Sequence, residues 1–348
     1  MNNAVNNDIH QVSEIKTPPD VTVVLPVYNG CRRSPTFLIS AINSVVNQDY
    51  PTFELIIVDD GSNEDYSDIV AQFAHDPRVR WVRKNNEGQS AARNYGAQLG
   101  CGKWLAFIDQ DDYWYPNRLK ITVNKMLEEH DHHNNCVMIY SDLDQIDAQS
   151  RIICRDYLQT RKLGTHPKKK IEDIIGENAF ILPGTMLVDR QVFLDLGGFD
   201  KRLSGYEDDE LALRFFYKGA IVFIDNALIQ WRIYAESYSY SSRMENSRKI
   251  FWEILIQAHP DEHDRNKLWV HNCIAPRFYY EWLHAWRNAI IHHNHEQSDS
   301  ARKGLMDVAA HLPLGQRIKA TMASFIPFKL AALLFSSKFM QRLAYYFL

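Results

Sequence analysis

Short apolar runs alternate with longer amphipathic stretches over the first part of this chain, from Val21 to about Asp142. Apolar, β-branched runs bounded by polar or turn residues predict strands, and stretches with helical spacing predict the helices between them. This alternation is typical of β-α-β units in a mainly parallel sheet, so we expect an α/β fold. The strands are expected at Val21–Val27, Phe53–Asp60, Val79–Arg83, Lys103–Asp112 and Cys136–Asp142, and the helices at Thr36–Val46, Glu64–Phe73, Gln89–Leu99 and Asn117–Glu129.

The composition excludes several classes of protein. Hydrophobic residues make up 45% of the 348 residues and charged residues 24%, which is ordinary globular usage and argues against a disordered or fibrous chain. The formal net charge of -4 provides no basic field, so nucleic acid is not an expected partner. The five cysteines are scattered without a Cys-x-x-Cys pair, which indicates reduced thiols and a cytoplasmic location.

Three regions are expected along the chain. Residues 1–20 are polar, lack the basic and apolar segments of a secretory signal, and predict a flexible leader. Residues 21–240 carry the strand and helix patterns, except that the basic stretch Arg151–Lys170 predicts an irregular surface loop, with a mobile lid as one use. Residues 241–348 have helical periodicity and a broad aromatic stripe, which predicts a helical C-terminal region whose aromatic residues pack between helices.

Three carboxylates follow the expected strand WLAFI within four residues, at Asp109, Asp111 and Asp112. Like charges this close repel one another, and a divalent cation is one way to hold them together. An all-oxygen ligand set suits Mg²⁺ or Mn²⁺ better than zinc or copper. The alternative is an acidic turn that caps the following helix.

Two further polar motifs follow strands of the same expected sheet. Asp59 and Asp60 end the run ELIIV, and ligands of open α/β sheets bind outside the carboxyl ends of the strands. In NNEGQSAARN, Gly88 allows a close backbone approach and Arg93 can reach a phosphate or a base edge. The alternatives are an ordinary turn for the first motif and a solvated helix face for the second.

In this order and at this spacing, the motifs VTVVLPVYNG, ELIIVDDGSNE, NNEGQSAARN and FIDQDD resemble the nucleotide-sugar-binding half of family 2 glycosyltransferases with the GT-A fold. The resemblance extends from Val21 to Tyr234. It implies a Rossmann-like mixed, mainly parallel sheet flanked by helices. It also implies a nucleotide-sugar-binding half at residues 21–142 and an acceptor and catalytic half at residues 143–240.

The resemblance implies roles for individual residues on the donor side. Pro26 and Tyr28 would lie beside the nucleotide base, and Asp59 or Asp60 would accept a hydrogen bond from the base. Asp109 would contact the ribose. The implied donor site therefore consists of Pro26, Tyr28, Asp59, Asp60, Gly88, Arg93, Asp109 and Arg232.

The family's DxD motif corresponds to Asp109-Gln110-Asp111 in this sequence. Asp111 would bind the Mn²⁺ or Mg²⁺ ion that bridges the two phosphates of the donor, with Asp112 supporting it. Such an ion neutralises charge as the bond between sugar and phosphate breaks.

Two downstream segments also resemble family motifs. In GYEDDELALR, Asp208 takes the position of the catalytic base of an inverting single displacement. A shift of the alignment by one residue would give this role to Glu207 or Asp209. The non-catalytic alternative is an acidic first turn of a helix, which the helix dipole favours. In QWRIYAES, Arg232 is a candidate for binding phosphate. Tyr234 stands where the family usually has His, which puts a metal or phosphate role for that position in doubt.

The resemblance implies a transferase that moves a sugar, with a UDP-sugar as the expected donor, to a glycan or lipid-linked glycan, as in polysaccharide biosynthesis for the cell envelope. A phosphohydrolase of the haloacid dehalogenase type is one alternative, because Asp109-Gln110-Asp111 superficially fits its nucleophile loop. A non-catalytic sugar-binding module is another.

Residues 317–348 mix apolar runs with basic residues and have no Asp or Glu. Peripheral contact with the inner face of the cytoplasmic membrane is one interpretation of this segment. A buried helix and a homodimer face are the others.

Overall fold

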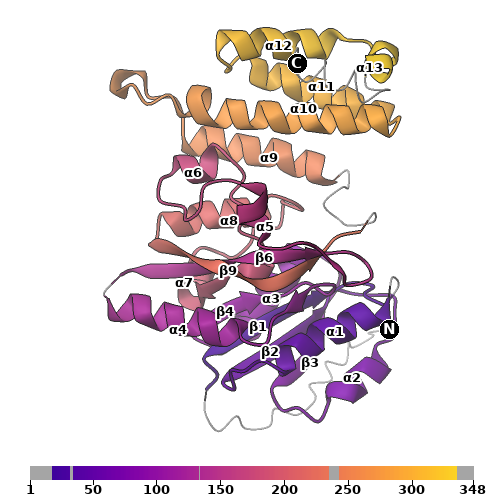
Figure 1. The fold of residues 1–348 in the computed structure, drawn as a ribbon, viewed down its shortest axis with the longest axis vertical. Coiled ribbons are helices and arrows are strands. Elements are labelled where there is room, and N and C mark those ends of the chain that lie inside the picture. Colours follow the sequence, from indigo (N-terminus) through magenta and orange to yellow (C-terminus); the bar gives the residue numbers. More distant parts are fainter. Residues whose placement is uncertain (1–17, 32–33, 133, 235–242, 335–348) are drawn as a thin grey trace, which may run out of the picture. The chain divides into compact units, whose positions relative to one another are not determined.

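Nine strands of the described residues form one mixed sheet in the order β3-β2-β1-β4-β8-β6-β9-β5, with β7 paired to β6 (Figure 1). The computed structural model describes residues 18–31, 34–132, 134–234 and 243–334. The strands are β1 (Val21–Val27), β2 (Phe53–Asp59), β3 (Val79–Arg83), β4 (Trp104–Phe107), β5 (Tyr113–Trp114), β6 (Cys136–Ile146), β7 (Ile152–Cys154), β8 (Leu187–Asp189) and β9 (Ala220–Arg232).

Helices connect these strands and make up the C-terminal region. They are α1 (Pro35–Val46), α2 (Ser67–Phe73), α3 (Gln89–Leu99), α4 (Arg118–Asp131), α5 (Tyr157–Arg161), α6 (Glu172–Ile175), α7 (Arg190–Asp195), α8 (Glu207–Phe216), α9 (Arg243–Ala258), α10 (Ala275–Ile291), α11 (His295–Ala309), α12 (Leu314–Phe325) and α13 (Phe328–Leu334). Short single turns are η1 (Pro183–Thr185), η3 (His263–Arg265) and η4 (Val270–Ile274).

The parallel half of the sheet consists of β3, β2, β1 and β4. Every residue of β1, β2 and β4 is buried, because strands covered on both faces need continuous apolar runs rather than alternating ones. Helix α3 packs on β1 and β2. The α/β arrangement expected from the alternating pattern is therefore confirmed.

The order of the parallel strands reverses between β1 and β4. The chain runs from β1 to β2 to β3 on one side of β1 and then returns to place β4 on its other side. Ligands of open α/β sheets bind outside the carboxyl ends of the strands at such a point. The residues that follow β1, β2 and β4 therefore lie at the edge where a ligand of such a sheet binds.

The sheet differs from the sequence prediction at several points. The strand expected at Lys103–Asp112 is shorter, because β4 ends at Phe107 and the polar residues after Ile108 form a turn; β5 follows that turn and was not predicted. The stretch Arg151–Lys170, predicted to be irregular, contains β7 and α5.

The described residues form two compact units. The first lies within residues 1–155, 183–198 and 224–232 and holds most of the sheet; the second lies within residues 156–182, 199–223 and 233–348 and is mostly helical. The expected boundaries at residues 142 and 240 stay predictions. Residues 1–17 of the expected leader and residues 335–348 of the basic, apolar segment lie outside the described residues.

The helical C-terminal region is confirmed. Helix α11 packs against α10 and α12 packs against α11 (Figure 1). Phe278, Trp282 and Trp286 of the aromatic stripe are at most 2% exposed, so they pack in the core as expected. Across the described ranges, the helices fall short of the length and apolar character that a bilayer crossing requires.

Candidate active site

The loops that follow β1 and β4 are tied together at the point where the strand order reverses. The backbone N–H of Tyr28 donates to Oε1 of Gln110 (3.0 Å), and Nε2 of Gln110 donates to the carbonyl oxygen of Tyr28 (3.4 Å). Pro26 is buried inside β1, whereas Tyr28 is 47% exposed. An aromatic ring is thus presented to solvent at the edge where a ligand of such a sheet binds.

Asp59 and Asp60 are both buried, and both already accept hydrogen bonds. Asp59 accepts from the N–H of Ser62 (2.9 Å) and pairs with Arg83 (3.1 Å). Asp60 accepts from three groups of the next loop, which are Nζ of Lys84 and the N–H groups of Glu87 and Gly88. Asp60 therefore holds the loop between β3 and α3 in place.

Gly88 begins α3 in a conformation that favours glycine, with φ at +92°. A Cβ atom at this position would meet nothing within 4 Å, so the constraint is the backbone conformation and not crowding. One turn later, Arg93 is buried and its Nη2 donates to Oδ1 of Asp109 (2.6 Å). Helix α3 thus connects the loop held by Asp60 to the acidic turn after β4.

The acidic turn after β4 separates its three carboxylates. Asp109 is 37% exposed and pairs with Arg93. Asp112 is buried, and its Oδ1 accepts from the N–H of Arg232 (3.0 Å). Burial, followed by the negative charges of Asp111 and Asp109, raises the pKa of Asp112 well above its ordinary value. Asp111 is partly exposed between them.

Arg232 binds backbone and hydroxyl oxygens of the same unit. Its Nε donates to the carbonyl oxygen of Asp111 (2.8 Å), and its Nη1 donates to the carbonyl oxygen of Asp147 (3.0 Å) and to Oγ of Ser150 (2.8 Å). The guanidinium also lies over the ring of Phe37, and the residue is 4% exposed. In this arrangement Arg232 fixes the turn that carries Asp111.

A divalent cation is the group that the acidic turn after β4 is expected to bind. Within residues 18–31, 34–132, 134–234 and 243–334, no three His, Cys, Asp or Glu side chains are grouped to hold a metal ion. Asp109 pairs with Arg93 and Asp112 is buried, so the three carboxylates do not form a ligand cluster by themselves, and the cation expected at Asp111 stays a prediction. Mg²⁺ commonly binds one or two carboxylates together with substrate phosphates, so the turn that carries Asp111 is compatible with a cation of this kind.

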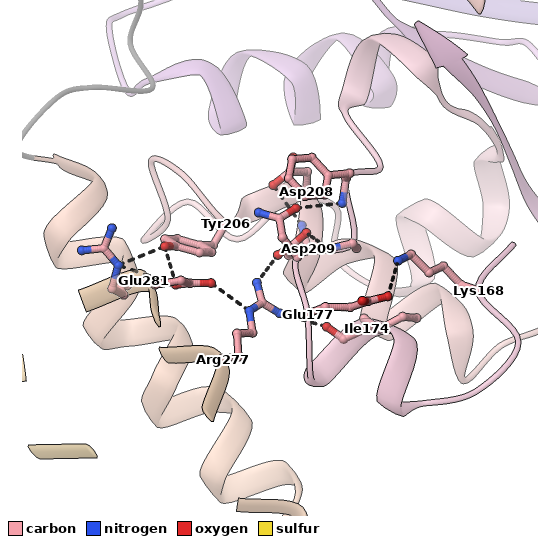
Figure 2. A network of polar contacts seen from close by, with 12 residues as sticks. Lys168, Ile174, Glu177, Tyr206, Asp208, Asp209, Arg277 and Glu281 are labelled. Atoms are coloured by element: carbon pink, nitrogen blue, oxygen red, sulfur yellow. Dashed lines mark hydrogen bonds and ion pairs between the residues drawn. The ribbon is translucent and has the colours of Figure 1, made fainter. Parts of the chain in front are cut away.

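The second unit carries the acidic helix start that contains Asp208. Figure 2 shows Asp208 and Asp209 at the start of α8, with Arg277 and Glu281 reaching toward them from α10. Asp208 is partly exposed, and its Oδ1 accepts from the N–H of Asp209 (3.0 Å). Desolvation, followed by the charges of Asp209 and Glu207, raises the pKa of Asp208 well above its ordinary value.

The neighbouring Asp209 has a different environment. It is buried, pairs with Arg277 and accepts from the N–H of Ala179 (3.0 Å). Arg277 also donates to Glu281 (2.9 Å), and Glu281 accepts from the hydroxyl of Tyr206 (2.6 Å) (Figure 2). One carboxylate is thus held by a salt-bridge network, while the preceding one remains accessible.

A buried lysine lies in the same network. The side chain of Lys168 is 0% exposed and its Nζ is 3.4 Å from Glu177 (Figure 2). Burial lowers the pKa of Lys168 from its ordinary value, and the charges of Glu177 and Asp209 oppose that change. Its ammonium group therefore adds positive charge near the start of α8.

Several residues of these networks were not predicted, among them Gln110, Lys84 and Arg277. Gln110 lies inside the motif FIDQDD, and Lys84 directly follows the strand Val79–Arg83, so a closer look at strand ends would have selected both. The sequence gives no comparable indication that Arg277 belongs to a site. It lies 68 residues after its partner Asp209, in a helix with an ordinary apolar pattern.

Residues 22–196 match glycosyl transferase family 2, and this match covers half of the chain. The chain therefore belongs to glycosyl transferase family 2, and the family resemblance carried by the four motifs is confirmed. The matched region is a glycosyltransferase domain, which sets aside the phosphohydrolase alternative. The roles of individual site residues stay predictions.

Curated relatives match part of the chain. An uncharacterized glycosyltransferase of Rickettsia bellii is 31% identical over 177 residues, which is 51% of this chain and 24% of that protein. The glycosyltransferase GlyG of Streptococcus pneumoniae is 27% identical over 222 residues, covering 61% of this chain and 70% of that protein. The chain thus spans only about a quarter of the length of the first relative.

Solved structures share the fold over almost the whole chain. The crystal structure of S. aureus TarS 1-349 in complex with UDP-GlcNAc has a TM-score of 0.65 at 16% identity, covering 93% of this chain and 92% of that one. The mannosyltransferase PcManGT of Pyrobaculum calidifontis, in complex with GDP-Man and Mn²⁺, has a TM-score of 0.51 at 16% identity, covering 94% and 87%. The expected GT-A fold with a helical C-terminal region is therefore confirmed.

Proposed function

We propose that this chain is an inverting glycosyltransferase that moves a sugar from a nucleoside diphosphate donor to a hydroxyl group of a glycan or lipid-linked glycan. The observation that carries the proposal is the family 2 match over residues 22–196, which contains the strand ends described above. The bound UDP-GlcNAc of TarS and GDP-Man of PcManGT support a nucleoside diphosphate sugar as the donor class. Uridine is the base we propose, because TarS is the more similar of these two folds.

On the donor side, we assign recognition of the base to Tyr28 and Asp59. A carboxylate offers about four acceptor sites. Asp60 uses three of them for the loop that contains Gly88, whereas Asp59 accepts from Ser62 and Arg83 and keeps more capacity. Pro26 would support the base from inside β1, and Arg93 would hold Asp109 toward the ribose.

We assign the divalent cation, Mn²⁺ or Mg²⁺, to Asp111 and the donor phosphates. When bound, the cation neutralises the charge that develops on the leaving diphosphate. The Mn²⁺ of PcManGT supports this choice. Arg232 would act on this step by fixing the Asp111 turn, because its guanidinium already donates to backbone and hydroxyl oxygens there.

We assign the role of general base to Asp208. The carboxylate would accept the proton of the acceptor hydroxyl while that oxygen attacks the anomeric carbon. The bond from this carbon to the diphosphate breaks, the nucleoside diphosphate leaves with the electron pair, and the anomeric configuration inverts. The raised pKa of Asp208 suits this role, because a general base works best when its pKa is near the operating pH.

A panel of sugar nucleotides with Mn²⁺ tests the donor and the metal together. A ligand present at about 100 times its Kd stabilises the native state by about 2.7 kcal/mol, so binding raises the melting temperature. We expect stabilisation by a UDP-sugar with Mn²⁺, a smaller effect with chelator, and loss of the metal effect in Asp111→Asn. The exposed residue Asp68 provides the control Asp68→Asn, which should behave like the wild type.

Two results would contradict the proposal. If the donor raised the melting temperature of the protein by the same amount in the presence of chelator, the assignment of a metal ion to Asp111 would be refuted. No stabilisation by any sugar nucleotide, together with no release of nucleoside diphosphate in the presence of acceptor glycans, would remove the enzymatic assignment.

A further inference from the structure

Helix α12 presents a row of four exposed apolar side chains, which we call the α12 stripe. Leu314 is 72% exposed, Ile318 51%, Met322 61% and Phe325 71%. Their spacing of four, four and three residues places them on one face of the helix. Scattered exposed apolar residues are ordinary, but four in one row on one helix indicate a contact surface.

The other face of α12 already packs against the protein. Ala320, Ala323 and Ser324 are buried, and α12 packs against α11. The stripe is therefore not the side of the helix that faces the core. Small residues face inward and large apolar residues face solvent, which is the reverse of an ordinary surface helix.

Basic residues flank the stripe on both sides. On a helical wheel, Arg317 and Lys319 lie about 100° to either side of the centre of the stripe. Arg317 is exposed and Lys319 partly exposed, and Lys329 is exposed at the start of α13. The sequence from Val308 to the last residue contains no Asp or Glu.

We propose that the α12 stripe lies in the surface of an anionic lipid membrane. The apolar side chains would enter the boundary between headgroups and acyl chains, and Arg317 and Lys319 would reach lipid phosphates from the two edges of the stripe. This inference deepens the proposed function, because a membrane-bound enzyme is placed beside a lipid-linked acceptor.

The charge pattern favours a membrane over a second copy of the chain. In a symmetric dimer the same patch faces itself, so basic residues from both copies would come together. Neither α12 nor α13 carries an acidic residue to pair with them. An anionic lipid surface supplies the missing negative charge, and each Lys or Arg near such a surface strengthens binding about fivefold.

Sedimentation with vesicles tests the proposal without any sugar donor, so its outcome is independent of the glycosyltransferase assignment. The full chain is mixed with vesicles of equimolar phosphatidylglycerol and phosphatidylcholine, or of phosphatidylcholine alone. We expect binding to the anionic vesicles that weakens with salt. The double variant Ile318→Ser, Met322→Ser should bind at least about 100-fold more weakly, because each position loses a buried apolar side chain.

A matched control uses another exposed isoleucine. Ile153 on β7 is 49% exposed, and Ile153→Ser should leave vesicle binding unchanged. Because Ile318 and Met322 are exposed, the double variant should keep the wild-type melting temperature, which separates lost binding from unfolding. Light scattering reports the mass of both proteins.

Three results would overturn the proposal. The first is wild-type protein that does not bind anionic vesicles. The second is equal binding to neutral vesicles, which would remove the role of the basic residues. The third is a wild-type dimer that the double variant converts to monomer, which would identify the stripe as a contact between copies.

Discussion

Arg277 on α10 and Asp209 on α8 form an ion pair in which each side chain is 2% exposed. The same guanidinium donates to the carbonyl oxygen of Ile174 (2.9 Å) and to Glu281 (2.9 Å). In Arg277→Met the charge of Asp209 would stay buried without its cation, a change that costs about 3–5 kcal/mol. We expect a loss of that size in the free energy of unfolding at neutral pH, measured by urea titration.

The pH dependence of this loss identifies Asp209 as its source. Burial raises the pKa of Asp209 and Arg277 lowers it, so the pKa rises further in Arg277→Met. A carboxyl group whose folded pKa exceeds its unfolded pKa loses stability as the pH rises between these two values. The deficit should therefore shrink at low pH, and adding Asp209→Asn should recover part of it at neutral pH. A deficit that neither pH nor the second substitution changes would refute this origin.

Close packing of α3 on the sheet leads to a second prediction. A Cβ atom at Gly96 would lie 2.4 Å from Cγ1 of Val24, a fully buried residue of β1. Val24 is β-branched and has no free rotamer to adopt, so Gly96→Ala must displace α3. We expect a loss of about 1–3 kcal/mol in the free energy of unfolding.

Gly315 on α12 is the matched control for this substitution. A Cβ atom at Gly315 would meet nothing within 4 Å. Gly315→Ala should therefore stabilise by about 0.5 kcal/mol, because alanine has the higher helix propensity. Opposite signs for the two variants in the same urea titration support the packing argument, and equal effects would refute it.

The sequence predicts the sheet better than it predicts the contacts of the site. Continuous apolar runs located β1 and β2, because a strand that is buried on both faces needs apolar side chains on both. Polar residues after those runs had to lie at one edge, which located Asp59 and Asp60. Two-residue β5 was missed, because so short a strand depends on its partner β9 and not on its own residues.

The contacts of the site that the sequence did not predict are made between residues far apart in the chain. The phosphate-binding role of Arg232 stays a prediction, and the sequence did not indicate that its guanidinium donates to the carbonyl oxygen of Asp111, 121 residues earlier. The pairing of Asp209 with Arg277 joins two helices whose sequences give no indication of each other. Tertiary packing decides such contacts, and no local pattern of charge or hydrophobicity specifies them.

Asp60 and the loop that it holds give a third prediction. In Asp60→Ala, the N–H groups of Glu87 and Gly88 lose their acceptor, and Nζ of Lys84 keeps the carbonyl oxygen of Asn85 and the carboxylate of Glu87. Each unsatisfied donor that stays buried costs about 1–3 kcal/mol, so we expect a total loss of about 2–4 kcal/mol after partial rehydration.

Hydrogen exchange localises this effect. The amide of Gly88 should exchange faster in Asp60→Ala, whereas amides of helix α10, which belongs to the other compact unit, should change only through the lower global stability. The exposed residue Asp68 offers the control Asp68→Ala, expected to change stability by less than about 0.5 kcal/mol. Unchanged protection of Gly88 would show that Asp60 does not hold the loop.

The fourth prediction concerns Asp208 as the proposed base. Asp208→Asn keeps the shape of the side chain but cannot accept the proton of the acceptor hydroxyl. Sugar transfer should fall by about 10²–10⁴-fold while donor binding is unchanged. Full activity of Asp208→Asn would show that another residue is the base. Donor binding without any transfer in the wild type would favour a sugar-binding module.

The pH profile of transfer tests the same assignment through a neighbour. A base works only when deprotonated, so transfer should decline as the pH falls through the raised pKa of Asp208. The charge of Glu207 helps to raise that pKa, and Glu207 accepts from the N–H of Gly205 (2.6 Å), an interaction that a glutamine oxygen preserves. Glu207→Gln should therefore move the acidic limb of the profile to lower pH, whereas Glu253→Gln on the exposed side of α9 should leave it in place. An acidic limb that stays fixed in Glu207→Gln would show that the group limiting transfer is not Asp208.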